Sequence, residues 1–307
     1  MDNPIIAPVN KKPAIYAIPY NENFPKPKEL DKEGIQRIVT AFVAAAKRAL
    51  RAGFDVIEIH NAHGYLLDSF ISPATNKRAD EYGGSFENRI RLTLEIVDAV
   101  RAVIPPSMPL FLRISATDWL EESLPNEPSW RSEDTVRLAG ILAEHGVDLL
   151  DVSSGGLHPQ QKIKGGPAYQ APFAEAVKKA HGDKILVGTV GNITHGHTAQ
   201  SVLEKGQADV VFVGLQFQKN PGTVWAFAED LGVTLTIALP LSIGMRATCP
   251  RPAHRRKQQR PEFEARSSYL PRLHLLSDVD ESLYDLGHAC QRWKIQQPSR
   301  LFILPPM

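Results

Sequence analysis

The sequence predicts an α/β fold of the (β/α)8 TIM-barrel type in which about five of the eight βα units are present. First, a glycine followed by a short β-rich run recurs three times, in residues 53–60, 146–153 and 206–214. Second, the segments between these runs carry apolar residues at helical spacing. Strands that alternate with helices must be parallel and joined by right-handed crossovers, so the pattern favours an α/β fold.

Each repeated run begins where a helix is expected to end. Gly53, Gly146 and Gly206 follow apolar-periodic segments, as a residue just beyond a helix C-terminus does, and an aspartate then precedes each apolar run. Two further runs, 109–115 and 184–190, are rich in β-branched and large apolar residues and fit the gaps between the helical segments. The sequence therefore predicts five strands.

Three segments have the apolar period of a helix that packs on a sheet. The first apolar face consists of Ile35, Ile38, Val39, Phe42, Ala45, Ala46 and Ala49. The second consists of Ile90, Leu94, Val97 and Val100, and Pro105 and Pro106 stop it. The third helix is expected to begin at Ser132 as its N-cap, with Glu133 and Asp134 in the first turn, and to close at His145 and Gly146.

Polar residues occupy the last inward positions of the predicted strands. They are Glu58 and His60 on the first strand, Arg113 and Ser115 on the second, and Ser153 on the third. In a TIM barrel the carboxyl ends of the strands face the active site, so these residues predict one shared site. An open doubly wound sheet would also gather them, but no G-x-G-x-x-G sequence follows any predicted strand. The barrel is therefore favoured.

Composition argues against several classes of partner. Lys and Arg number 35 and Asp and Glu 34, so the net charge is +1, which gives no electrostatic reason to expect a nucleic acid or a membrane surface. Residues 1–20 contain four prolines and no apolar signal-peptide core. Cys249 and Cys290 cannot build a disulfide framework or a CxxC metal site. We expect a cytoplasmic protein with a small-molecule substrate.

The character of the chain changes after about residue 233. Residues 234–307 are rich in arginine and proline and lack any apolar period. We expect two parts, a partial barrel over residues 1–233 and a poorly ordered tail over residues 234–307. A targeting or RNA-binding patch is the alternative interpretation of the basic run.

The segment from Glu58 to Pro73 is the richest in chemically useful side chains. His60 ends a predicted strand, His63 lies on the loop beyond it, and Tyr65 follows a glycine that lets the chain turn. Two histidines three residues apart where a strand runs into a loop can offer paired donors to a carbonyl or nitro oxygen, and Tyr65 could then give a proton. The alternatives are a zinc site and structural hydrogen bonding. Zinc would need a third ligand, and the nearest polar strand end is the cationic Arg113.

Five stretches together resemble the Old Yellow Enzyme family of FMN-dependent NAD(P)H oxidoreductases. They are residues 53–66, 76–89, 112–115, 151–155 and 187–193, and the resemblance extends over about residues 16–233. The His-x-x-His form resembles the thermophilic-like ene-reductase branch. The resemblance implies a TIM barrel that holds FMN at the carboxyl ends of its strands and takes NAD(P)H as reductant. It also allows a homo-oligomer.

The resemblance further implies a role for particular residues. His60 and His63 would hold the activating oxygen of the substrate, and Tyr65 would donate a proton. Arg113 would lie against the N1/O2 edge of the flavin, and the backbone at Gly191 and Gly214 would cradle the FMN phosphate. The reaction would pass a hydride from NAD(P)H to the flavin and then to the β-carbon of an activated alkene, such as an enone or a maleimide.

The sequence departs from the family in three places. It begins at about the fourth barrel strand, it has Leu215 where the family has an arginine that pairs with the FMN phosphate, and its closing segment after Val233 is unrelated. These departures leave a rival hypothesis, an inactive remnant that no longer holds FMN. A third hypothesis is a metal-dependent TIM-barrel hydrolase that uses His60 and His63.

Overall fold

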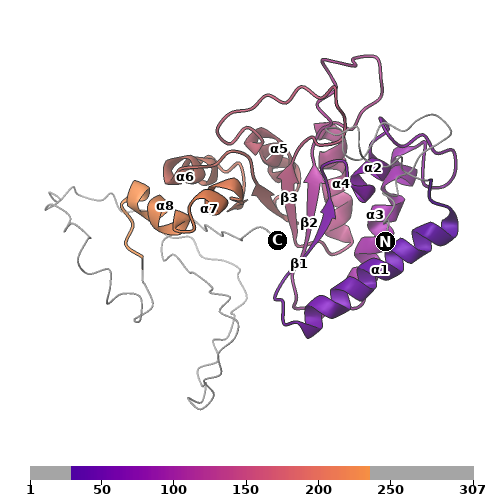
Figure 1. The fold of residues 1–307 in the computed structure, drawn as a ribbon, viewed down its shortest axis with the longest axis horizontal. Helices are drawn as coiled ribbons and strands as arrows, with labels where there is room; N and C mark the ends of the chain where they lie inside the picture. Colours follow the sequence, from indigo (N-terminus) through magenta and orange to yellow (C-terminus); the bar gives the residue numbers. More distant parts are fainter. Residues whose placement is uncertain (1–28, 236–307) are drawn as a thin grey trace, which may run out of the picture. The chain divides into compact units, whose positions relative to one another are not determined.

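A computed structural model of the chain describes residues 29–235, which build one parallel sheet (Figure 1). The five strands pair side by side in the order in which they occur along the chain. They are β1 (Ile57–Asn61), β2 (Leu110–Ser115), β3 (Leu149–Ser153), β4 (Leu186–Thr189) and β5 (Val210–Val211). Parallel neighbours in chain order are what repeated right-handed βα units produce, so the predicted fold class and its five units are confirmed.

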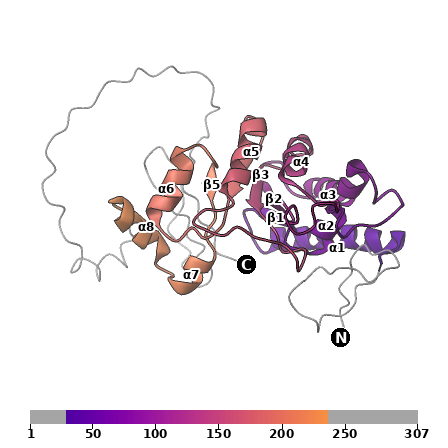
Figure 2. The ribbon, with the colours of Figure 1, turned by 90° about the horizontal axis from the view of Figure 1, so that it is seen from above.

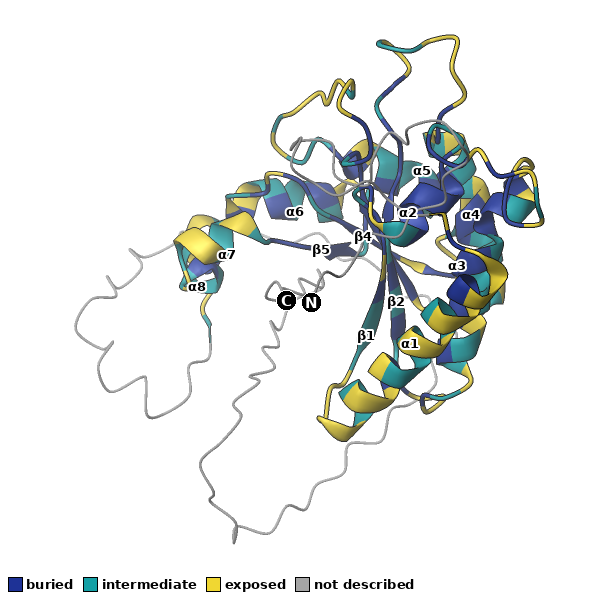
Figure 3. Cartoon of the chain, turned by 45° about the vertical axis from the view of Figure 1, so that its right-hand side comes forward, coloured by how far each residue is buried: buried dark blue, intermediate teal, exposed yellow. Residues whose placement is uncertain are grey.

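At least one helix follows every strand of the sheet. The helices are α1 (Lys32–Arg51), α2 (Leu66–Ile71), α3 (Phe86–Arg101), α4 (Ser132–Glu144), α5 (Ala171–His181), α6 (Gly196–Glu204), α7 (Leu215–Lys219) and α8 (Thr223–Leu231). Helices α3 to α6 succeed one another in chain order beside the strands (Figure 2). Figure 3 shows α1 exposed on its outer side, while its inner side is buried or half-buried.

The two faces of the sheet have different surroundings. Alternate strand residues such as Leu112, Ile114 and Val152 belong to the main core, together with the apolar residues of the helices. Residues of the opposite face, which we call the open face, form a small cluster of Leu149, Val210 and Phe212 that contains no residue of the described helices. Because side chains alternate along a strand, the polar positions Glu58, His60, Arg113, Asp151 and Ser153 also lie on the open face.

Side chains bond to the backbone at the points where α1 and α4 begin. The Asp31 carboxylate accepts the Gly34 N–H at 2.7 Å and starts α1. The expected cap of α4 was placed one residue too late, since Ser132 is already helical and Arg131 is the N-cap. The Asp134 carboxylate accepts the Arg131 N–H at 3.1 Å. That bond satisfies the backbone at this end of the helix without the Ser132 hydroxyl.

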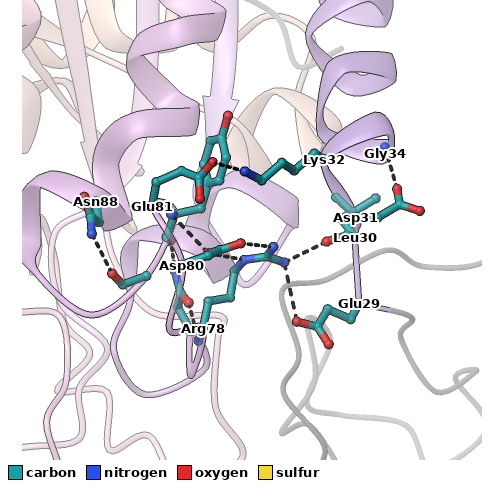
Figure 4. A network of polar contacts seen from close by, with 12 residues as sticks. Glu29, Leu30, Asp31, Lys32, Gly34, Arg78, Asp80, Glu81 and Asn88 are labelled. Atoms are coloured by element: carbon teal, nitrogen blue, oxygen red, sulfur yellow. Dashed lines mark hydrogen bonds and ion pairs between the residues drawn. The ribbon is translucent and has the colours of Figure 1, made fainter.

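A buried arginine ties the segment before α3 to the start of α1 (Figure 4). Arg78 donates to both carboxylate oxygens of Asp80, at 2.9 and 2.6 Å, and to the Leu30 carbonyl at 2.8 Å. Lys32 pairs with Glu81 at 2.7 Å in the same region. Polar residues of the segment 76–89 therefore hold helices together, and this part of the motif serves the fold.

Several sequence-based expectations lie outside the described residues. The predicted tail covers residues 234–307, and the structure describes only the first two of these. Cys249 and Cys290 also lie outside the described residues. The division at residue 233 therefore stays a prediction. Within residues 29–235, no helix is both long and apolar enough to cross a membrane.

Candidate active site

The strand register brings the predicted polar residues to one end of the sheet. His60 is the register partner of Arg113, and Arg113 is the partner of Asp151. Two residues further along β2 and β3, Ser115 is the register partner of Ser153. Side chains from β1, β2 and β3 therefore meet on the open face at the carboxyl ends of the strands, where the sequence predicts the site.

A tight turn with unusual backbone angles positions His63. The Tyr65 N–H bonds to the Ala62 carbonyl at 3.2 Å, and the two residues between them are left-handed, His63 with φ 60° and Gly64 with φ 75°. A left-handed non-glycine residue is strained and persists where surrounding contacts hold it. The Ser115 hydroxyl accepts the His63 N–H at 2.9 Å. The buried Asp68 carboxyl accepts the Gly64 N–H at 2.7 Å.

The turn gathers the three residues that were predicted to be catalytic. The ring centroids of His60 and His63 are 5.3 Å apart, and those of His60 and Tyr65 are also 5.3 Å apart. The side chain of Tyr65 is 49% exposed, so its phenol can reach a bound molecule. The described structure thus places two imidazoles and one phenol within reach of a single small ligand.

Desolvation and a nearby cation lower the pKa of both histidines, although His60 itself is an exposed residue. Burial, then the Arg113 charge, then His60 lower the pKa of His63 to about 3. Burial and Arg113 also lower the pKa of His60. A neutral imidazole carries one N–H donor and one acceptor nitrogen. Each ring can therefore donate to a ligand oxygen at pH 7 without carrying a charge.

Arg113 lies among carboxyl groups that burial makes less acidic. Its Nε is 3.2 Å from Oδ2 of Asp151. Burial raises the pKa of Asp151 to about 6, while Arg113 opposes the shift. Burial also raises the pKa of Glu58 to about 7, with Asp151 adding to the shift and Arg113 opposing it. The guanidinium side chain remains 27% exposed on the open face, available to an anionic or electron-rich ligand.

The two glycines expected to cradle a phosphate follow neighbouring strands. Gly191 comes after β4 and has φ +126°, and a methyl group there would lie 2.9 Å from Nε2 of Gln170. A glycine at position 191 is therefore explained by the packing of Gln170 alone, without a bound phosphate. Gly214 precedes α7, and no described atom lies within 4 Å of the place that a side chain would take. Leu215 follows it and is 61% exposed.

Sequence reasoning missed several partners of the site. Ser115 and Ser153 were recognised as inward-facing but not as hydrogen-bond partners of His63. Gln170, in the long connection after β3, and the buried acid Asp68 were not anticipated. The pairing of β1 with β2 and of β2 with β3 brings Ser115 and Ser153 to the turn, and no spacing in the sequence encodes it. Asp68 is only four residues from Gly64, so its contact with the turn is local. Within residues 29–235, no three His, Cys, Asp or Glu side chains are grouped so that they could hold a metal.

Known proteins resemble the chain over most of the described region. The NADH:flavin oxidoreductase / NADH oxidase family matches residues 6–231. An NADH:flavin oxidoreductase of Gibberella zeae is 56% identical over 222 residues, which are 70% of this chain and 53% of that protein. An NADPH dehydrogenase of a Geobacillus species is 45% identical over 246 residues, 80% of this chain and 67% of that protein. The chain thus spans about half the length of the first relative and two thirds of the second.

Solved structures of the same kind share the fold. Morphinone reductase in complex with tetrahydroNAD matches with a TM-score of 0.56 and 29% identity, over 77% of this chain and 62% of that chain. The old yellow enzyme homologue from Zymomonas mobilis matches with a TM-score of 0.58 and 27% identity, over 75% of this chain and 62% of that chain.

These matches confirm that the chain resembles the Old Yellow Enzyme family, as its motifs indicate. The names of the relatives agree with the enzyme class that the sequence predicts, an NAD(P)H-dependent flavin oxidoreductase. Membership of the family implies FMN as cofactor and NADH or NADPH as reductant. With the family matched over residues 6–231, the chain belongs to the NADH:flavin oxidoreductase / NADH oxidase family, the family of the Old Yellow Enzyme.

Proposed function

We propose that the protein reduces the carbon–carbon double bond of small activated alkenes, such as enones and maleimides, with FMN and NAD(P)H. The observation that carries the proposal is the grouping of His60, His63 and Tyr65 on the open face, next to Arg113. Two neutral donors beside a phenol suit a substrate that has one oxygen to polarise and one carbon to protonate.

The residues at the open face fit the ring end of a flavin. Arg113 offers a guanidinium whose buried Nε makes no hydrogen bond within residues 29–235, although the Asp151 carboxylate is its ion partner. Leu186, 45% exposed, and the half-buried Phe111 add apolar surface on the same face, which a planar ring could cover. FMN, when bound, supplies the hydride chemistry. Arg113 would hold its electron-rich edge by charge and hydrogen bonding.

The residues expected at the phosphate end of FMN include no positively charged side chain. The backbone at Gly191 and Gly214 would hold the phosphate, but Leu215 contributes no charge where the resemblance leads us to expect an arginine. A phosphate without a charged side-chain partner loses about 1.5–3 kcal/mol of binding free energy. We therefore expect FMN to bind, but more weakly than a site with arginine at this position would allow.

The histidines and Tyr65 would have different roles in reduction of the alkene. His60 and His63 would donate N–H bonds to the carbonyl oxygen of the substrate and so withdraw electrons from its double bond. Tyr65, exposed and adjacent to His60, would give its hydroxyl proton to the α-carbon. This role needs no charge change at either histidine, because the pKa of each is lowered from its ordinary value of 6.5.

The test is turnover by the full chain supplied with FMN, NADPH and cyclohexenone. We expect NADPH consumption that depends on the enone. Tyr65→Phe should slow formation of the saturated ketone while NADPH still bleaches the flavin, because only the protonation step loses its donor. Tyr82→Phe is the matched control, since the Tyr82 hydroxyl bonds to Glu95 at 3.0 Å and not to the site.

Two other outcomes would contradict the proposal in different ways. A flavin that NADPH reduces but that no enone reoxidises would exclude alkene reduction and leave the family membership intact. A folded chain that binds no FMN would favour the inactive remnant.

A further inference from the structure

Gln170 begins helix α5, but its side chain does not cap that helix. It is the N-cap residue, and its backbone carbonyl accepts the Phe173 N–H at 3.1 Å. A polar side chain at this position ordinarily accepts an N–H of the first helical turn, and the Gln170 side chain makes no such bond. The residue is 2% exposed, so its amide is buried against other parts of the chain.

The amide of Gln170 links the segments that follow two neighbouring strands. Its Oε1 accepts the Ser154 hydroxyl at 2.5 Å, and its Nε2 donates to the Val190 carbonyl at 2.9 Å. Ser154 comes directly after β3, and Val190 comes directly after β4. A backbone carbonyl can only accept, so the end of the amide that faces Val190 must be its NH₂ group.

The contact with Val190 fixes the direction of the N–H that follows it. The Val190 carbonyl and the Gly191 N–H belong to one peptide unit, and no peptide bond in residues 29–235 is cis. In a planar trans peptide, the carbonyl and the N–H point in opposite directions. Because Gln170 holds the carbonyl, the Gly191 N–H points away from Gln170.

This N–H has no acceptor in the part of the chain that the structure describes. Gly191 is nevertheless a buried residue, and buried backbone N–H groups are nearly always paired. An oxygen of a bound ligand would supply the pairing. A methyl group at Gly191 would lie 2.9 Å from Nε2 of Gln170 and 3.0 Å from Cε1 of Tyr169, so the peptide unit packs tightly on the side of Gln170.

We infer that Gln170 is a positioning residue that fixes the peptide unit of Val190 and Gly191, so that the Gly191 N–H is presented to an anionic oxygen of a ligand. With the proposed function that oxygen belongs to the phosphate of FMN, so the use of the N–H rests on that proposal. The contact between Gln170 and Val190 is a property of the chain alone. Without it, the peptide unit could rotate and the N–H would lose its direction.

The contact can be observed without flavin. In the full chain labelled with ¹³C-carbonyl valine and ¹⁵N-glycine, only a Val–Gly peptide unit gives a carbonyl–amide correlation, and the sequence has three, at 187–188, 190–191 and 213–214. Val187→Ile and Val213→Ile assign the three signals. Gln170→Met should move the 190–191 signal, because the carbonyl loses its donor, and should leave the 187–188 signal, which arises within β4, in place.

Gln207→Met is the matched control, because it removes an amide that bonds to Glu175 at 2.9 Å and not to Val190. It should leave the 190–191 signal in place. If the methionine variant of Gln170 does not fold, Gln170→Glu at pH 8 keeps the shape of the side chain without a hydrogen to donate, and it should move the same signal. An unmoved 190–191 signal in a folded Gln170 variant would overturn the inference.

A second measurement addresses the use of the N–H. Calorimetric titration of Gln170→Met should show FMN affinity reduced about three- to tenfold, the loss expected for one hydrogen bond, and riboflavin affinity reduced less than about twofold. A general loosening of the fold would weaken both flavins alike, so equal losses would overturn the assignment of the Gly191 N–H to the phosphate. Failure of the unaltered chain to bind either flavin would count against the proposed function, and the flavin-free signals would still decide whether Gln170 holds the peptide unit.

Discussion

The side chains of Arg113 and Asp151 form an ion pair between neighbouring strands, with Nε 3.2 Å from Oδ2. Asp151 is 1% exposed, and its Oδ1 makes no hydrogen bond within residues 29–235. Arg113 is therefore the group that compensates the Asp151 charge. The same guanidinium lowers the pKa of both site histidines. One side chain thus serves the stability of the sheet and the charge state of the site.

Replacing Arg113 by Met should destabilise the fold. Removal of one partner of a fully buried pair costs about 3–5 kcal/mol, and the partial exposure of Arg113 reduces the expected loss to about 1–3 kcal/mol. Urea unfolding at pH 8 measures it. The loss should shrink below pH 6, where the Asp151 carboxyl becomes protonated in the folded state. Lys164→Met, which breaks a solvent-exposed pair with Glu122, should cost clearly less than Arg113→Met, because water and salt screen that pair. Equal losses in the two variants would contradict the account.

Asp118→Asn should make stability depend less on pH. Burial raises the pKa of Asp118 from 3.8 to about 7, so the folded state holds a proton that the unfolded chain releases. This contribution to stability is complete below about pH 4 and is lost as pH rises toward 7. Asparagine can still accept the bonds from Ser72, at 2.6 Å, and from the Trp130 N–H, at 2.7 Å.

Urea unfolding of both proteins between about pH 4.5 and 8 tests this expectation, with the window set by the two pKa values. The variant should gain stability relative to the unaltered chain as pH rises. The buried Asp68, whose pKa is raised first by burial and then by the Asp118 charge, gives both curves a further slope in the same direction, which is smaller in the variant because that charge is gone. Parallel curves would show that Asp118 does not titrate as described.

Gly156→Ala should disturb His63 through its backbone. Gly156 has φ +92°, and an added methyl group would lie 2.5 Å from Cα of His63. A side chain at such an angle costs more than about 1 kcal/mol even without a clash. Urea unfolding should show that loss, and the nitrogen shifts of His63 should move. Gly165→Ala is the control, because nothing lies within 4 Å of its added methyl group. Matching stabilities would argue against the contact.

Leu215→Arg should strengthen binding of FMN. A charge-assisted contact to the phosphate contributes about 1.5–3 kcal/mol, which corresponds to roughly ten- to a hundredfold in affinity. The gain should decrease as salt concentration rises, because part of it is Coulombic. Calorimetric titration should show no comparable gain for riboflavin, which lacks the phosphate, or for Leu215→Met. A gain shared by FMN and riboflavin would show that the arginine does not reach a phosphate.

Local signals in the sequence were sufficient for the framework of the fold. Gly53, Gly146 and Gly206 mark helix ends because each has positive φ, and the apolar runs after them are the strands. The grouping of His60 with Arg113 was predictable, because parallel strands align their carboxyl ends. These features depend on neighbours in sequence or on the regular geometry of a sheet.

Contacts between distant loops could not be predicted in the same way. The bond from His63 to Ser153 joins residues 90 positions apart, and Gln170 reaches the site only because its connection folds back over the end of β3. Polar residues around Arg78 look functional in sequence, yet they bind one another and the start of α1. Side-chain type alone does not distinguish a group that binds a ligand from one that satisfies a buried partner.

The most direct test of the account is titration of the purified full chain with FMN, followed by flavin fluorescence and absorbance. We predict saturable binding that survives desalting, weakened at least about tenfold in a folded Arg113→Met variant and unchanged in Lys164→Met. Absence of flavin from a folded chain, or equal affinity in the Arg113 variant, would contradict the claim that this open face is a flavin site.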